Sequence, residues 1–147
     1  AAGMVMYAPE TLDNLLQICK ESQLLTIADE VMTGFGRTGK FFASEYMHKK
    51  PDIICLSKGL TGGTMALGVT ACTDRIYQAY VNDDSLKTFF HGHSFTANPV
   101  ACAASNASFD LLIQDETTAN IQRIMTKHQA FALEIKDPLN FLYSIRH

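Results

Sequence analysis

Two side chains that could share one chemical task follow two short apolar runs of the sequence. Asp29 comes directly after the run 24–28, and Lys58 comes directly after the run 53–57. Neither run alternates between apolar and polar residues, which is typical of parallel strands that are buried on both faces. Ligands bind at the carboxyl ends of such strands. We therefore expect a carboxylate and an amine at one edge of a sheet, where they could contact the same ligand.

This pair of groups suits pyridoxal phosphate (PLP). A lysine amine can bond to a carbonyl cofactor, and an acid that pairs with the pyridinium nitrogen lets the ring accept electrons from a substrate carbanion. The simpler alternative is that Asp29 and Lys58 lie exposed on loops, as both residue types usually do. Asp and Lys after strands are common, so these two residues alone leave both interpretations open.

A longer pattern surrounds the pair. Asp29-Glu30-Val31 is followed by Thr-Gly-x-Gly-Arg-Thr-Gly at 33–39, by Pro51-Asp52 and by Ser57-Lys58-Gly59. In order and spacing, this pattern resembles the class III aminotransferases. The segments 60–65 (LTGGTM) and 90–99 (FHGHSFTANP) are similar to one subgroup, the diaminopelargonate aminotransferases of biotin synthesis. The resemblance covers roughly residues 1–135.

The resemblance implies an α/β fold, namely a three-layer αβα arrangement with a mostly parallel sheet. It divides the chain into residues 1–114, the C-terminal half of a PLP-binding large domain, and residues 115–147, a linking helix and the start of a small domain. Members of the family are much longer chains, so we expect these residues to be a part of a larger enzyme and inactive alone. The stretch 137–147 departs from the family pattern, which suggests a truncated or out-of-frame tail.

The resemblance also assigns roles to residues. Lys58 would be the catalytic residue that holds PLP and contacts substrate, and Asp29 would pair with the pyridinium nitrogen. The loop 91–94 would cross the interface of a homodimer, where Ser94 and His93 bind the phosphate of the partner's PLP and Gly92 lies against substrate. Ser94 stands where the family more often has Thr, which preserves the hydroxyl donor. A polar turn that caps the following helix is the simpler alternative, and both can hold because helix N-termini bind anions.

The implied reaction is amino transfer to 8-amino-7-oxononanoate, giving 7,8-diaminononanoate. S-adenosylmethionine is the usual amino donor in the subgroup, and some relatives use lysine. Met32 stands where most class III enzymes have Gln, which favours this subgroup over ornithine-type enzymes. Two alternatives stay open: another class III enzyme that acts on ω-amino acids or diamines, and an inactive fragment of one.

Three further patterns in the sequence bear on ligand binding. Gly34-x4-Gly39-Lys40 nearly matches a phosphate-binding P-loop, but Phe41 replaces the required hydroxyl, and the pattern does not directly follow the strand. His91-x-His93 lacks partner ligands at zinc-binding spacing, so we expect no metal. Arg37 is expected either to pair with a carboxylate beside the cofactor or to lie in solvent.

The apolar periodicity and the turn residues predict the elements that position these groups. Asp74 is expected to cap a helix, and the small residues of the helix that starts at Pro99 predict that this helix is buried. The expected helices are 9 to about 22, 41–46, 75–81, 99 to about 113 and 115 to about 134, and the expected strands are 24–28, 53–57 and 65–71.

Composition narrows the function class. The 147 residues are 47% hydrophobic with a net charge of −3, which suggests one domain-sized core and no nucleic-acid partner. The apolar runs are shorter than the roughly 20 residues of a membrane span, and the start of the sequence does not read as a signal peptide. The four cysteines have no C-x-x-C pair and are expected to be buried, reduced thiols of a cytoplasmic protein.

Overall fold

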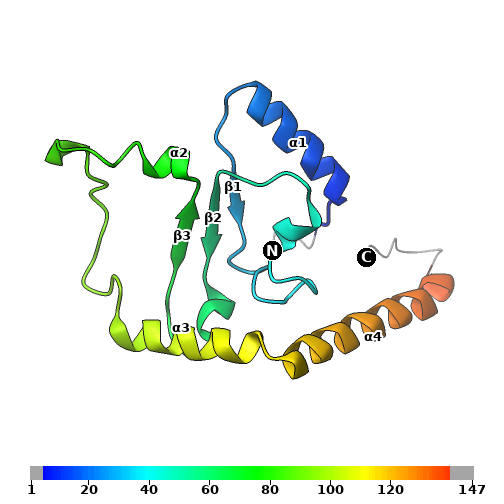
Figure 1. Ribbon diagram of the computed structural model, residues 1–147. Helices are drawn as coiled ribbons and strands as arrows, with labels where there is room; N and C mark the ends of the chain where they lie inside the picture. Colours follow the sequence, from blue (N-terminus) through cyan, green and yellow to red (C-terminus); the bar gives the residue numbers. More distant parts are fainter. Residues whose placement is uncertain (1–4, 140–147) are drawn as a thin grey trace.

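A computed structural model describes residues 5–139 (Figure 1). The three short strands form one sheet, and most of the helices lie around its ends. The α-helices are α1 (Pro9–Glu21), α2 (Asp74–Tyr77), α3 (Pro99–Leu112) and α4 (Asp115–Leu139). The strands are β1 (Ile27–Asp29), β2 (Ile53–Leu56) and β3 (Val69–Cys72), and the 3-10 helices are η2 (Ala43–Tyr46), η3 (Lys58–Thr61) and η4 (Ser85–Lys87).

The sheet has the order β1-β2-β3 and mixed direction. β1 pairs with β2 in parallel, with Asp29 opposite Cys55, whereas β3 pairs with β2 antiparallel, with Val69 opposite Leu56. We expected a mostly parallel sheet. In the described residues only the pair β1–β2 is parallel, and the pair β2–β3 is antiparallel. The cause lies in segment 57–68, which holds one 3-10 turn and no long helix that could return the chain to the other end of the sheet.

The strands are more exposed than predicted. Ile27 is 64% exposed and Val69 is 42% exposed, so the prediction of strands buried on both faces is wrong for the described residues. Figure 1 shows the physical reason: α3 and α4 follow one another along one end of the sheet instead of covering its faces. The prediction that α3 is buried is wrong for the same reason, because only Ala101 in this helix is buried.

Helix starts follow the sequence signals, with one exception. Proline occupies the first turns of α1 and α3, and the Asn98 side chain accepts hydrogen bonds from the backbone N–H groups of Val100 (2.9 Å) and Ala101 (3.2 Å). The prediction for Asp74 is wrong. This residue lies inside α2 and accepts a hydrogen bond from the Gln78 side chain, so it caps nothing, and α2 is shorter than expected.

α4 begins at Asp115 as predicted and continues to Leu139, beyond the expected end near 134. The break between α3 and α4 coincides with the domain boundary predicted at 114, and the division into two domains stays a prediction. The proposed truncated or out-of-frame tail lies mostly outside the described residues.

A carboxylate attaches α1 to the turn before β2. Asp13 is buried and accepts hydrogen bonds from the backbone N–H groups of Lys49 (2.8 Å) and His48 (3.1 Å). These two bonds lower the pKa of Asp13 below its usual value. Cys19, Cys55, Cys72 and Cys102 are free, but the prediction that they are buried is wrong for this structure, because three are half-buried and Cys72 is exposed. Among the described helices, none is both long and apolar enough to cross a membrane.

Candidate active site at the ends of β1 and β2

Asp29 and Lys58 lie at the same edge of the sheet. Asp29 is the last residue of β1, and Lys58 begins η3 one residue after the end of β2. Since β1 and β2 are parallel, their carboxyl ends meet at this edge. The structure therefore brings together the two residues that the sequence singled out, and their chemical roles stay predictions.

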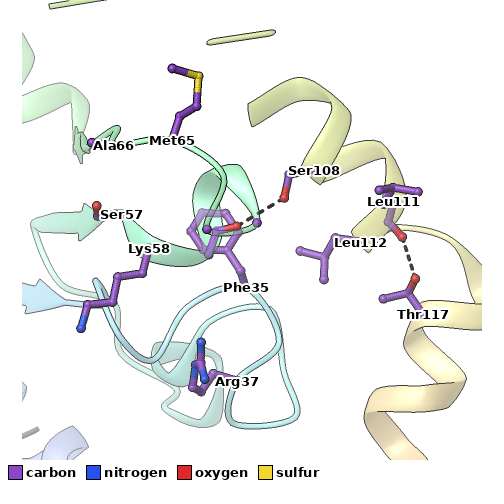
Figure 2. A pocket seen from close by; sticks show the side chains of 13 residues that line it. Phe35, Arg37, Ser57, Lys58, Met65, Ala66, Ser108, Leu111, Leu112 and Thr117 are labelled. Atoms are coloured by element: carbon purple, nitrogen blue, oxygen red, sulfur yellow. Dashed lines mark hydrogen bonds between the residues drawn. The ribbon is translucent and has the colours of Figure 1, made fainter. Parts of the chain in front are cut away.

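The side chains of Asp29 and Lys58 are both exposed, and both can form further hydrogen bonds. One oxygen of Asp29, Oδ1, accepts a hydrogen bond from the backbone N–H of Val31 at 3.0 Å. Within the described residues, the other oxygen of Asp29 and the amine of Lys58 have no hydrogen-bond or ion-pair partner. Figure 2 shows the Lys58 side chain directed away from α3.

Lys58 has an unusual backbone conformation. Its φ of 29° lies on the left-handed side that non-glycine residues rarely adopt. Hydrogen bonds fix the residues on either side of it: the Ser57 hydroxyl donates to Leu67 O at 2.7 Å, and the hydroxyl of Thr61, a buried residue, donates to Met65 O at 2.6 Å. Backbone strain of this kind persists only where the surroundings enforce it, and it is concentrated at functional sites.

η3 rests on α3 and borders a hollow of about 670 Å³. This volume is in the range of small-molecule sites. The Ser108 hydroxyl of α3 donates to Gly59 O at 3.4 Å, a contact drawn in Figure 2. Three segments supply most of the lining: the glycine-rich loop (Phe35, Arg37), the chain around η3 (Ser57, Lys58, Gly59, Gly62, Gly63, Met65, Ala66) and α3 (Ser108, Leu111, Leu112), with Thr117 from α4.

The glycine-rich loop 33–39 is a series of turns that packs against α4. A Cβ atom on Gly39 would stand 1.8 Å from Sδ of Met125, and Gly39 also has a φ of 100°, so both space and backbone require glycine there. The loop leads into further turns and the short η2, not into an α-helix. The P-loop interpretation is therefore wrong, because that motif must open a helix that receives the phosphate.

Arg37 lines the hollow and is exposed. In the part of the chain that the structure describes, the one ion pair within 4.0 Å joins Arg75 to Asp52. The carboxylate partner expected for Arg37 is thus not found among these residues, and the solvated alternative describes this side chain.

The segment that holds Gly92, His93 and Ser94 is an exposed turn that leads into α3. The backbone N–H of His93 donates to the Thr96 hydroxyl at 3.0 Å, and Nδ1 of His93 accepts from the backbone N–H of Phe95 at 3.1 Å. None of the three residues lines the hollow beside Lys58. The structure does not bring them to the Lys58 of the same chain, and their contact with a partner's cofactor stays a prediction. No cluster of three metal-ligating side chains occurs in residues 5–135.

Sequence reasoning missed Glu30. This carboxylate is only 3% exposed and accepts hydrogen bonds from the Thr33 hydroxyl and from the backbone N–H groups of Ala43 (3.0 Å) and Ser44 (2.6 Å). The available signal was its position directly after Asp29 at a strand end, because successive side chains of a strand point to opposite faces. An exposed Asp29 therefore implies that the next side chain turns inward.

Comparison with known proteins places these features in context. The family model described as Aminotransferase class-III matches residues 1–147. A curated relative from Synechococcus elongatus, an adenosylmethionine-8-amino-7-oxononanoate aminotransferase, is 50% identical over 116 residues, which are 79% of this chain and 27% of the relative. Further relatives of the same name are 38–45% identical. The chain thus spans about a quarter of the length of the curated relatives that it matches.

Two solved structures share the fold. The adenosylmethionine-8-amino-7-oxononanoate aminotransferase of Methanocaldococcus jannaschii superposes with a TM-score of 0.77 at 36% identity, covering 95% of this chain and 32% of that one. The taurine:2-oxoglutarate aminotransferase of Bifidobacterium kashiwanohense, solved in complex with PLP and glutamate, superposes with a TM-score of 0.78 at 29% identity, covering 86% and 28%. These likenesses confirm the predicted α/β fold class.

Proposed function

The chain belongs to the class-III aminotransferase family, and from this premise we propose that the whole protein containing residues 1–147 transfers amino groups with PLP as its cofactor. The observation that carries the proposal is the placement of Asp29 and Lys58 at the ends of two neighbouring parallel strands. An acid and an amine at one sheet edge are the groups that PLP chemistry needs. Lys58 also lines the hollow of about 670 Å³, whereas Asp29 does not.

The residues at this edge fit the cofactor. The Lys58 amine is exposed and has no partner among the described residues, so it can bond to the cofactor's carbonyl carbon. Asp29 has an oxygen to spare beyond the bond from Val31, and this oxygen can pair with a ring N–H. When bound, PLP supplies an electron sink for the carbanion that forms at the substrate carbon.

The roles of the two side chains follow from their chemistry. The Asp29 carboxylate would accept a hydrogen bond from the ring N–H and so would orient the ring and favour the protonated nitrogen. Lys58 would also have a second role. When its Nζ is not bonded to the cofactor, it would be a base that could take a proton from the donor carbon and return it.

We propose 8-amino-7-oxononanoate as the amino acceptor and S-adenosylmethionine as the donor, with 7,8-diaminononanoate as the product. The names of the curated relatives at 38–50% identity support this assignment. The fold alone does not select it, because a taurine aminotransferase superposes equally well. Another class-III activity, on ω-amino acids or diamines, is therefore the second candidate. The reduced cysteines also suit a cytoplasmic enzyme.

A product assay tests the proposal. The whole protein is incubated with PLP, 8-amino-7-oxononanoate and either S-adenosylmethionine or lysine, and 7,8-diaminononanoate is measured by mass spectrometry. We expect product with S-adenosylmethionine and none with the Lys58→Ala variant. Transfer to a 2-oxo acid from an ω-amino acid or diamine, without any 7,8-diaminononanoate, would establish the second candidate instead.

We further propose that the active protein is a homodimer in which residues 92–94 complete the partner's site. Two observations support this arrangement. The turn around Ser94 is exposed, and it lies apart from the hollow beside Lys58 of its own chain. Both observations support a phosphate site that serves a second copy.

A further inference from the structure

Glu30 is a buried charge that the proposed chemistry does not use. It is 3% exposed, and acidic side chains are almost never so buried unless they are paired. Among the described residues, no Lys, Arg or His lies within 4.0 Å of its carboxylate. Its partners are instead hydrogen-bond donors: the Thr33 hydroxyl and the backbone N–H groups of Ala43 and Ser44.

These donors decide the ionisation state of Glu30. Burial acts to raise the pKa of the carboxyl, but the hydrogen bonds from Thr33, Ser44 and Ala43 together outweigh it, so the pKa lies below its usual value. The group is therefore an anion at neutral pH. A charged acceptor forms stronger hydrogen bonds than a neutral one, which suits a group that must hold a loop in place.

The hydrogen bonds of Glu30 close the loop 31–42, which contains the glycine-rich loop 33–39, at both ends. At the near end, its backbone N–H donates to Cys55 O of β2 at 2.9 Å, and its carbonyl accepts from Gly34 N at 3.0 Å. At the far end, its carboxylate binds the start of η2 at Ala43 and Ser44. One residue thus fixes the two ends of the loop 31–42 against the same point of the sheet.

This loop presses Phe35 onto the turn that begins with Lys58. Phe35 has a φ of 60°, and its Cβ would stand 2.8 Å from a Cβ atom placed on Gly59. On its other side, its ring meets the Phe42 ring edge-on at 5.8 Å between centroids. Phe42 directly precedes the residues that Glu30 binds. The chain of contacts therefore runs from Glu30 through Phe42 and Phe35 to Gly59 and its neighbour Lys58.

We propose that Glu30 is a positioning residue for the Lys58 amine. Its carboxylate holds the loop 31–42 closed, the closed loop keeps Phe35 against Gly59, and this contact maintains Lys58 in its left-handed backbone conformation. The inference rests on the proposed function for its catalytic meaning. The alternative is that Glu30 contributes to stability alone and has no influence on Lys58.

The main experiment compares two variants in the whole protein. Glu30→Gln keeps the shape of the side chain but replaces the anion by a neutral group, whose NH2 cannot accept from Ala43 or Ser44. Asp13→Asn is the matched control, because Asp13 is also a buried acid that accepts two backbone N–H bonds, at the turn between α1 and β2. Both variants are expected to lower stability, and only Glu30→Gln is expected to affect Lys58.

Three measurements follow the effect of Glu30→Gln from the loop to Lys58. Hydrogen exchange at the Ala43 and Ser44 amides should accelerate in Glu30→Gln. The rate of Lys58 acylation by acetic anhydride at fixed pH, read by peptide mapping, should change in Glu30→Gln and match wild type in Asp13→Asn. PLP should be trapped on Lys58 by borohydride with an apparent affinity weakened about tenfold in Glu30→Gln, as expected for loss of bonds to a charged group.

A double-mutant cycle tests the route through Phe35. In a Phe35→Ala background the contact with Gly59 is already lost, so Glu30→Gln should add little further change at Lys58. Additive effects, or an unchanged rate of Lys58 acylation in Glu30→Gln, would overturn the inference. Because acylation needs no cofactor, a wild-type protein that fails to trap PLP would refute the proposed function while the acylation data still decide on the role of Glu30.

Discussion

The carboxylate of Asp52 accepts two hydrogen bonds from Thr26, one from its backbone N–H and one from its hydroxyl, each 2.9 Å long. The Thr26 hydroxyl in turn accepts from Asp52 N at 3.1 Å, and the second carboxylate oxygen binds Arg75 at 2.8 Å. Thr26 precedes β1, Asp52 precedes β2, and Arg75 lies in α2 after β3. One side chain therefore joins all three strands at the edge of the sheet opposite Lys58.

Asp52→Asn should destabilise the whole protein by about 1–3 kcal/mol at neutral pH, because an amide cannot replace a charged acceptor of three bonds. Arg75 and the Thr26 bonds lower the pKa of Asp52 in the folded protein. The stabilisation is therefore present above the usual pKa of 3.8 and is lost as pH falls through the lower folded value. Urea unfolding at a series of pH values from neutral to acid is the measurement. The difference in free energy of unfolding between wild type and Asp52→Asn should shrink as the pH falls. Asp83→Asn, at an exposed carboxylate, is the control, and an equal effect there would contradict the prediction.

Much of the local structure could be predicted because its causes are local. Pro9 and Pro99 mark the starts of α1 and α3. Of the predicted strand 24–28, only Ile27 and Ala28 lie in β1, which also includes Asp29, whereas the predicted strand 53–57 agrees with β2 except for Ser57. Since the pairing of those strands is parallel, the sequence order of the two residues was enough to place them at one edge. The placement of Asp29 and Lys58 at one edge of the sheet was thus predictable from the ends of two strands.

The rest depends on partners that are far apart in the sequence. The antiparallel pairing of β3, the burial of Glu30 and the contact of Phe35 with Gly59 all require the path of the chain between strands to be known. Helix α3 shows the same limit. Its small residues allow close packing, but burial also depends on which other elements pack against the helix, and this information is not contained in the sequence of α3.

Gly39→Ala should be more destabilising than Gly63→Ala. Both glycines have positive φ, 100° and 80°, so an added Cβ strains the backbone at either position. A Cβ at Gly63 meets nothing within 4 Å, whereas one at Gly39 meets Sδ of Met125 at 1.8 Å and Oη of Tyr46 at 3.1 Å. We expect about 1–3 kcal/mol from backbone strain in each case and a further loss at Gly39 from the clash.

Chemical denaturation of the two variants in wild-type and Met125→Ala backgrounds separates the two causes. Removal of the Met125 side chain should lower the cost of Gly39→Ala toward that of Gly63→Ala, with a smaller excess left from the contact with Tyr46 Oη at 3.1 Å. If the two glycine variants lose equal stability in the wild-type background, then α4 does not press on the glycine-rich loop in solution.

Lys58→Ala should abolish both covalent attachment of PLP and amino transfer, because no other amine occupies the end of β2. Borohydride reduction of the whole protein with PLP, followed by peptide mapping, is the measurement. Lys40→Ala is the matched control: the Lys40 amine binds Glu45 O at 3.1 Å and lies over the Tyr46 ring, so it should be unlabelled and dispensable. Label on Lys40 in the wild type would refute the assignment of Lys58.

Asp29→Asn should leave PLP bound on Lys58 and slow amino transfer by several orders of magnitude. The amide oxygen can still accept the bond from Val31, so the local backbone is preserved, but the charge that holds the ring proton is lost. Each 1.36 kcal/mol lost from the transition state costs about tenfold in rate. Single-turnover kinetics with a saturating donor measure the loss, with the exposed Asp110→Asn as control. Near-native turnover of Asp29→Asn would show that another group pairs with the ring.

Ser94→Ala should weaken PLP binding while leaving the chemistry of Lys58 intact. If Ser94 donates a hydrogen bond to a cofactor phosphate, its loss removes a bond to a charged group worth roughly 1.5–3 kcal/mol, which corresponds to about 10- to 150-fold in affinity. Thr96→Val serves as a control in the same turn, because the Thr96 hydroxyl accepts from His93 N and shapes the turn without the predicted contact. A similar loss of affinity in both variants would mean that the shape of the turn matters and the Ser94 hydroxyl does not.

The same substitution tests whether the site is shared between two chains. Full-length Lys58→Ala chains lack the amine, and full-length Ser94→Ala chains lack the phosphate donor. In a mixed dimer, a loop that crosses the interface places the Ser94 defect in the site that already lacks Lys58, so the second site is complete. Subunit exchange at limiting PLP should then raise activity above that of either parent. If Ser94 served its own chain, each mixed site would carry one defect, and activity would not rise even when native mass spectrometry confirms that the subunits have exchanged.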